Sequence, residues 1–149
     1  MEKSDIRKQV EEFMVAAGQE VKDTPGIPDE ETIKLRAKLT MEEAFEFLEA
    51  LFGESDDLTM LESSVVSLIE SSKPNVNIVE VADSLGDMDV VNEGARLAFG
   101  INGKPVADEI HRSNMAKFGI GSYKREDGKL MKPPGWTPPD IAGVLEKQK

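Results

Sequence analysis

Two groups of acidic residues have the types and spacing needed to bind a divalent cation. Within each group the residues are one, three, four or seven positions apart, so each group lies along one side of a helix. The second group falls in a segment, 76–99, that is apolar on nearly all sides, where a carboxylate is costly unless a positive charge meets it. If the two helices face each other, their carboxylates form the kind of site that binds magnesium for phosphate chemistry. The groups are Glu42, Glu43 and Glu46, and then Glu80, Asp83 and Asp87.

Each acidic group also has a purely structural interpretation. Over residues 41–52, apolar side chains fill one arc of the helix and glutamates fill most of the other, which is the ordinary pattern of a solvated amphipathic helix. In the second group, Asn77 followed by Glu80 has the spacing of a capping pair at a helix start. That role does not account for Asp83 and Asp87, which lie one and two turns further along.

The residue types restrict which metal such a site would bind. The chain has no cysteine and a single histidine, His111, whereas zinc and copper prefer nitrogen and sulfur ligands. An EF-hand ladder is missing, and a ferritin-like di-iron centre would need two Glu-x-x-His elements. Oxygen ligands suit magnesium, so we expect Mg²⁺, with Mn²⁺ able to replace it. The sequence contains no Walker loop, no Gly-x-Gly-x-x-Gly motif and no Ser-His-Asp pattern.

Composition narrows the class of protein and its partners. At 149 residues, with 39% hydrophobic and 32% charged residues, the chain fits one globular domain. Its net charge of −11 argues against nucleic-acid and membrane-surface binding, because both partners are negative. A nucleotide substrate stays compatible, because bound cations reverse the charge locally. The N-terminal residues have no signal-peptide character and no segment reaches transmembrane length, so we expect a cytoplasmic protein.

Helical patterns dominate the elements that must position these residues. Aromatic content is 5%, and no convincing period-two run predicts a strand. The patterns predict one all-α domain over 1–149: a four-helix bundle as core, about 5–118, and a C-terminal extension, 119–149. In the extension, Asp127-Gly128 is a turn signal for a small hairpin. The expected helices span 5–17, 28 or 29 to 51 or 52, 57–69, 76–99, 105–118 and 137–147.

Three motifs, taken together, resemble those of a known superfamily. Glu42-Glu43-x-x-Glu46 followed by Glu80-x-x-Asp83 is similar to the paired acidic motifs of the MazG-like, all-α nucleoside triphosphate pyrophosphohydrolases. Phosphoribosyl-ATP pyrophosphohydrolase and the all-α dUTPases belong to the same superfamily. The segment DEIHRSNMAKFG resembles its third motif, and the tail DGKLMKPPGWTPPDI resembles a MazG-like subgroup that includes bacterial dUTP-hydrolysing members. The resemblance covers residues from about 33 to 145.

This resemblance implies hydrolysis of a nucleoside triphosphate to the monophosphate and pyrophosphate. It implies that Glu43 and Glu46 are the catalytic pair, with Glu43 orienting the attacking water. The implied magnesium ligands are Glu42, Glu43, Glu46, Glu80 and Asp83, where Glu42 either binds the metal or holds another ligand in place. The implied substrate-binding residues are Asn114 and Lys117, with Lys129 and Lys132 reaching phosphates from the tail. The alternative for Asn114 and Lys117 is a polar surface at the end of a helix, and the alternative for Lys129 and Lys132 is exposed lysines that offset the acidic surface.

The resemblance also bears on assembly and substrate. Family members usually form dimers or tetramers, so we expect a homodimer or homotetramer; an apolar 76–99 helix fits burial between protomers, or burial in a single core. We expect a (deoxy)nucleotide substrate such as dUTP and a housecleaning role in nucleotide pools. One alternative is phosphoribosyl-ATP hydrolysis in histidine synthesis, and another is a non-catalytic acidic bundle that docks a basic partner. His111 is expected to pack or form a hydrogen bond near Met115 and Phe118, and Trp136 to anchor the tail.

Overall fold

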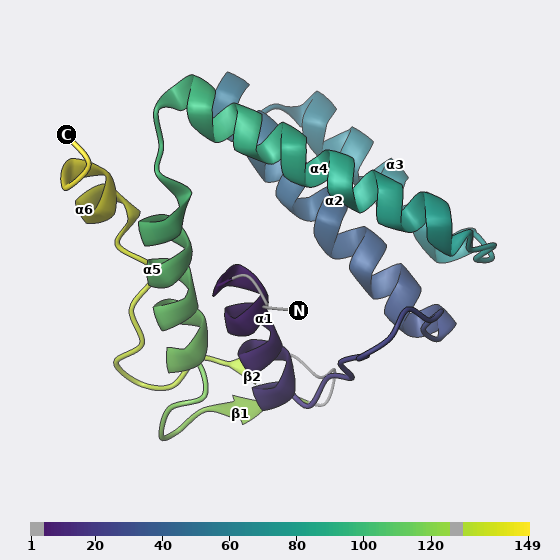
Figure 1. Ribbon diagram of the computed structural model, residues 1–149, viewed down its shortest axis with the longest axis horizontal. Coiled ribbons are helices and arrows are strands. Elements are labelled where there is room, and N and C mark those ends of the chain that lie inside the picture. The colour runs from purple at the N-terminus through teal and green to yellow at the C-terminus, as the bar shows by residue number, and fades with distance from the viewer. Residues whose placement is uncertain (1–4, 126–129) are drawn as a thin grey trace. The chain divides into compact units, whose positions relative to one another are not determined.

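The computed structural model describes residues 5–125 and 130–149, and this part of the chain is mostly helical (Figure 1). The predicted all-α class is therefore confirmed, as is a C-terminal extension with a hairpin and a short helix. In order, the elements are α1 (Asp5–Ala16), α2 (Glu30–Phe52), α3 (Asp56–Ser71), α4 (Ile78–Phe99), α5 (Gly103–Ala116), β1 (Tyr123–Lys124), β2 (Leu130–Met131) and α6 (Ile141–Glu146).

Packing within the chain forms two compact units. The α2–α3 unit is Thr24–Asp83. The α1–α5 unit comprises the described residues of Met1–Asp23 and Ser84–Lys149, and it contains α1, α4 from Ser84 onward, α5, the hairpin and α6. The expectation of one domain over 1–149 stays a prediction.

In the α2–α3 unit, two capped helices pack against each other (Figure 1). The Asp29 side chain accepts a 2.8 Å hydrogen bond from the Thr32 N–H and starts α2. Gly53 ends α2 with a φ of 87°, a left-handed value that favours glycine. Phe45 on α2 is buried, at 8% exposure, and provides a core contact. The Nζ of Lys38 forms an ion pair with Glu70, which ties α2 to the end of α3.

In the α1–α5 unit, α1 packs along α5 through apolar and polar contacts (Figure 1). The rings of Phe13 and Phe118 lie 5.5 Å apart between centroids. The His111 Nε2 lies 2.8 Å from a Glu12 carboxylate oxygen, so this histidine joins the two helices. Its hydrogen-bond partner comes from α1, which the pattern within α5 could not have indicated.

The hairpin and the C-terminus are fastened to the helices of the same unit. The strands are antiparallel, with Tyr123 opposite Met131, while the Asp127-Gly128 turn expected to close them lies outside the described residues. The Lys124 Nζ donates a 2.7 Å hydrogen bond to the Ala17 carbonyl, which satisfies the open end of α1. The Gln148 side chain both accepts from the Asn102 N–H at 2.8 Å and donates to the Asn102 carbonyl at 3.1 Å.

Helix α4 is exposed along most of its length and has no buried residue; Ile78, Ala95 and Arg96 are half-buried. Val79 is 74% exposed, Val90 is 71% exposed and Leu97 is 73% exposed. Exposed apolar patches of this kind mark interaction surfaces. Among the described residues, no helix is both long and apolar enough to cross a membrane.

Candidate functional site

The first acidic group forms one turn of α2 whose carboxylates interact electrostatically. Glu42, Glu43 and Glu46 are exposed, on the same helix as the buried Phe45. The pKa of Glu43 is raised, chiefly by its partial burial and further by the charges of Glu46 and Glu42. We call these three residues the α2 acidic turn. It concentrates negative charge at one place, and a bound cation would relieve that repulsion.

The second acidic group begins in the first turn of α4. The Asn77 side chain accepts hydrogen bonds from the N–H groups of Val79, at 3.1 Å, and Glu80, at 3.4 Å. The predicted Asn77 cap is therefore confirmed, and it uses the backbone of Glu80 rather than its carboxylate. Within the described chain, the side chains of Glu80 and Asp83 form no hydrogen bond and no ion pair, so both remain available to a cation.

The two acidic groups do not form one cluster in the described single chain. Over residues 5–125 and 130–149, no three His, Asp or Glu side chains are placed so that they could hold one metal ion. The donor chemistry nevertheless fits magnesium, since these residues offer carboxylate oxygens only. A single magnesium site thus stays a prediction, and its ligands would have to lie closer together than they do in the described chain. The predicted ligands are Glu42, Glu43, Glu46, Glu80 and Asp83.

The third motif places an amide and an ammonium group at the end of α5. The Lys117 Nζ donates a 3.1 Å hydrogen bond to the Asn114 side-chain oxygen, and both residues are half-buried. The pKa of Lys117 is lowered, first by burial and then by the charge of Lys132. The predicted alignment of Asn114 with Lys117 is confirmed, while their role in substrate binding stays a prediction.

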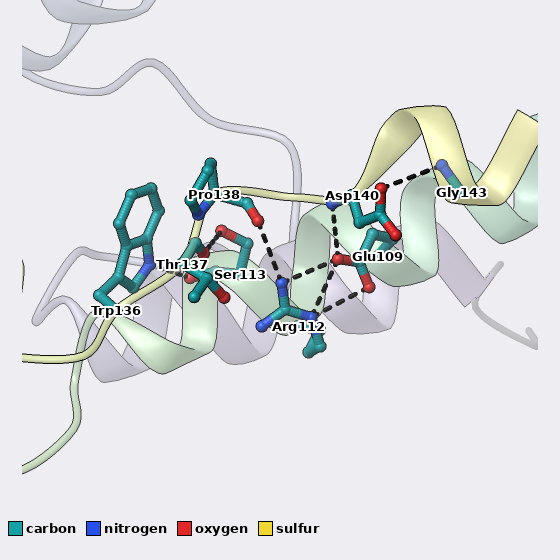
Figure 2. A network of polar contacts seen from close by, with 8 residues as sticks. All are labelled: Glu109, Arg112, Ser113, Trp136, Thr137, Pro138, Asp140 and Gly143. Atoms are coloured by element: carbon teal, nitrogen blue, oxygen red, sulfur yellow. Dashed lines mark hydrogen bonds and ion pairs between the residues drawn. The ribbon is translucent and has the colours of Figure 1, made fainter.

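Trp136 brings the tail to this end of α5. Its Nε1–H donates a 2.9 Å hydrogen bond to the Ser113 carbonyl, which confirms the predicted anchoring role (Figure 2). The Lys132 Nζ lies 4.1 Å from the centre of the Trp136 ring, and the Lys117 Nζ lies 5.9 Å from it. The structure therefore brings Lys117 and Lys132 to one aromatic ring. Lys129 lies outside the described residues.

A salt-bridged network fastens the rest of the tail to α5, and the sequence pattern did not indicate it. The Glu109 carboxylate binds Arg112 at 2.8 Å and accepts a 2.9 Å hydrogen bond from the Asp140 N–H (Figure 2). These contacts lower the pKa of Glu109 to about 2, with the Arg112 hydrogen bond as the largest cause. The only signal in the sequence was the three-residue spacing of Glu109 and Arg112, which predicts a local ion pair but not its tail partner.

Within the described residues, a depression lies along α1 and α5, and its lining mixes polar and apolar side chains. It measures about 420 Å³, and Gln9, Arg96, Lys104 and Asp108 contribute to its wall. These polar groups pair with one another or with neighbours, for example Lys104 with Asp108 at 2.9 Å and Gln9 with Asp108 at 2.7 Å. None of the predicted site residues lines this depression, so it does not mark the predicted site.

Comparison with known proteins decides the family. The family model for phosphoribosyl-ATP pyrophosphohydrolase matches residues 10–114, more than half of the chain. The chain belongs to the phosphoribosyl-ATP pyrophosphohydrolase family. This membership places it in the MazG-like, all-α superfamily predicted from the acidic motifs, and it confirms a pyrophosphohydrolase enzyme.

A solved structure extends the family match across the tail. The chain is similar to the crystal structure of a candidate NTP pyrophosphohydrolase from Exiguobacterium sp. 255-15, with 26% identity and a TM-score of 0.74. The similarity covers 99% of this chain and 97% of that one. No curated protein matches the chain in a sequence search.

The family match includes all of the predicted acidic ligands but ends within the third motif. Glu42, Glu46, Glu80 and Asp83 fall inside residues 10–114, and the match stops at Asn114. Lys117, Lys132 and Trp136 lie beyond it. In this member of the phosphoribosyl-ATP pyrophosphohydrolase family, the residues gathered at Trp136 therefore need their own physical argument.

Proposed function

We propose that this protein hydrolyses a (deoxy)nucleoside triphosphate, dUTP being the first candidate, to the monophosphate and pyrophosphate with the aid of Mg²⁺. The α2 acidic turn carries the proposal. In a pyrophosphohydrolase family member, it gathers three carboxylates on one turn, and the pKa of Glu43 is raised first by partial burial and then by the charges of Glu46 and Glu42. Such a concentration of charge suits a hard divalent cation with oxygen ligands. We further propose that the enzyme acts on cytoplasmic nucleotide pools as a housecleaning activity.

The proposed ligands for magnesium, or manganese in its place, are Glu42, Glu43, Glu46, Glu80 and Asp83. When bound, the cation would supply positive charge that offsets the charge of the phosphates. In the reaction, water attacks phosphorus and the anhydride bond between the α and β phosphates breaks. Glu43 orients that water, and its raised pKa suits a carboxylate that takes up a proton from it. Glu46 is the second carboxylate of the proposed catalytic pair.

The proposed substrate contacts come from α5 and the tail. Lys117 would meet a phosphate by its charge, and the Asn114 amide, now bonded to Lys117 at 3.1 Å, would hold that lysine or contact the substrate. Lys132 would reach a phosphate from the tail, and Lys129 is proposed for the same purpose from its place in the sequence. The substrate itself is a small-molecule nucleotide, since the net charge of −11 opposes a polyanionic nucleic acid.

We propose that the enzyme acts as a homodimer or homotetramer, with α4 in the interface. Val90 is 71% exposed and Val91 is 69% exposed on a helix without a buried residue, which supports burial against a second copy. The acidic residues Glu80 and Asp83 begin the same helix. Self-association would therefore also shield Glu80 and Asp83 from water. It would set the distance between these residues and the α2 acidic turn.

A substrate panel tests the proposed reaction. Purified enzyme with Mg²⁺ is offered dUTP, the other deoxynucleotides, the ribonucleotides and phosphoribosyl-ATP, and pyrophosphate and the monophosphate are both measured. Preferred turnover of a deoxynucleotide supports the proposal. Glu46→Gln and Asp83→Asn should each lower the rate by roughly 100-fold or more. Glu54→Gln, in the exposed connection between α2 and α3, is the charge-matched control and should leave the rate unchanged.

Phosphoribosyl-ATP hydrolysis is the second candidate, because the matching family model is described by that activity. Turnover of phosphoribosyl-ATP alone would replace the deoxynucleotide proposal with this one. If no compound releases pyrophosphate and the Glu46 and Asp83 variants match the parent in stability and magnesium response, the enzymatic proposal fails. A non-catalytic acidic bundle would then account for the chain.

A further inference from the structure

Among the described residues, the ammonium groups of Lys117 and Lys132 have no acidic partner, in a chain that is rich in acid. The sequence has 29 acidic and 18 basic residues, so carboxylates are in excess. Lys34, Lys104 and Arg112 each form an ion pair. In the part of the chain that the structure describes, neither Lys117 nor Lys132 does so. The hydrogen-bond acceptor of Lys117 is the neutral Asn114 amide oxygen at 3.1 Å.

These two like charges lie near the same aromatic ring. Both Nζ atoms lie near one indole, Lys132 at 4.1 Å and Lys117 at 5.9 Å from the ring centre. The negative face of the ring attracts a cation, but the two cations repel each other. The pKa of Lys117 is lowered first by burial and then by the charge of Lys132, and the second part of this shift reflects the repulsion. A bound anion would remove it.

Trp136 and the residue that follows it are both hydrogen-bonded to Ser113 on α5. Its Nε1–H donates to the Ser113 carbonyl at 2.9 Å, and the Oγ of Ser113 donates to the Thr137 carbonyl at 3.2 Å. Ser113 is only 2% exposed, so these bonds are shielded from water. Figure 2 shows the indole lying beside α5, with its N–H directed at the helix backbone. The ring is therefore anchored to α5 one turn before Lys117.

We propose that Trp136 is a positioning residue that holds Lys117 and Lys132 as a paired cationic site for a diphosphate. The ligand class is two adjacent phosphate groups, as in the leaving pyrophosphate or the terminal phosphates of the substrate. Each lysine side chain ends in one point charge, so the pair suits two neighbouring phosphates better than it suits a single phosphate. The inference rests on the proposed function in that the substrate is a polyphosphate. Its test needs no turnover.

Trp136 is the one tryptophan in the chain, so it reports on its own surroundings. The full chain, freed of divalent metal with a chelator, is titrated with inorganic pyrophosphate while tryptophan fluorescence is recorded. We expect a saturable change in emission. Lys117→Gln and Lys132→Gln should each weaken binding about tenfold, the typical effect of losing one charge-assisted contact. Lys8→Gln, an exposed position on α1, removes the same charge and should bind like the parent.

The role of Trp136 is tested by calorimetry with the same ligand. Trp136→Phe keeps an aromatic face but loses the N–H, whereas Trp136→Leu loses both, so pyrophosphate affinity should fall in that order. If Trp136 acts through the lysines, Lys132→Gln should have little further effect in the Trp136→Leu background, and the salt dependence of binding should already be shallow. A merely structural tryptophan gives additive effects and an unchanged salt slope, which would overturn the positioning role.

The lysine variants keep the inference falsifiable if Trp136→Leu unfolds. Pyrophosphate binding that is absent at millimolar concentration, or equal in the parent and both lysine variants, would overturn it even if nucleotide hydrolysis is found. Conversely, tight pyrophosphate binding that depends on both lysines would support it even if the substrate panel shows no turnover. The proposed diphosphate site and the proposed hydrolysis can therefore each be refuted without refuting the other.

Discussion

The Glu109 carboxylate accepts a 2.9 Å hydrogen bond from the backbone N–H of Asp140, which lies 31 residues further along the chain. Asp140 in turn caps α6, since its side chain accepts a 3.0 Å hydrogen bond from the Gly143 N–H. Arg112 binds the same Glu109 carboxylate and the Pro138 carbonyl. One carboxylate on α5 thus connects the helix to the segment that ends the chain.

This arrangement predicts a pH dependence of stability. The folded-state pKa of Glu109 is lowered to about 2 from an ordinary value of 4.5. Its contribution is therefore present above about pH 4.5 and is lost as the pH falls toward about 2. Glu109→Gln should lower Tm at neutral pH, and its deficit against the parent should vanish at the acid end. Paired thermal melts across this range measure the difference, and a constant deficit would contradict the prediction.

Partial burial of Glu43, together with repulsion within the α2 acidic turn, predicts that removing the Glu43 charge stabilises the metal-free protein. The pKa of Glu43 is raised in the folded state, so its ionised form disfavours folding at neutral pH and the penalty disappears on acidification. In chelator, Glu43→Gln should raise Tm by about 1–2 °C. The comparison is Glu54→Gln, which lies outside the turn. A Tm below that of the parent would refute the electrostatic account.

Magnesium should stabilise the parent protein more than the variants that lack one acidic ligand. Free Mg²⁺ at roughly ten times its Kd should raise the parent Tm by about 3–6 °C, because the ion binds the folded state preferentially. Glu46→Gln and Asp83→Asn should each lose at least half of that rise, while Glu54→Gln keeps it. Melting curves with and without Mg²⁺ provide the measurement. Equal shifts in all four proteins would show that the acidic groups do not share an ion.

The exposure of α4 predicts that one charge on this helix weakens self-association. Val90 is 71% exposed, and burying an aspartate there against a second copy would leave an unpaired charge in an apolar surface. Val90→Asp should weaken the association by roughly 100-fold or more. Light scattering after size exclusion reports the mass. Val15→Asp is the control, because Val15 is 63% exposed on α1; an assembly that tolerates Val90→Asp would place the interface elsewhere.

Local signals in the sequence were sufficient for most of the helices. Asn77 begins α4, Gly53 ends α2, and Asn114 and Lys117 lie on one side of α5, as their spacing predicts. Each of these features depends on residues within a few positions of each other, so the order of the amino acids contains the necessary information. The α2 acidic turn belongs to the same class, as one turn of helix brings Glu43 next to Glu42 and Glu46.

The sequence by itself determined the helices, their caps and the residue types offered to a divalent cation. Only the tertiary structure placed Lys117, Lys132 and Trp136 together and joined Glu109 to Asp140, because such contacts depend on how distant segments pack. The surroundings of α4 belong to the same category. Its apolar residues predict that the helix is buried. Because the hydrophobic effect is non-directional, the same pattern arises whether the helix packs within its own chain or against a second chain.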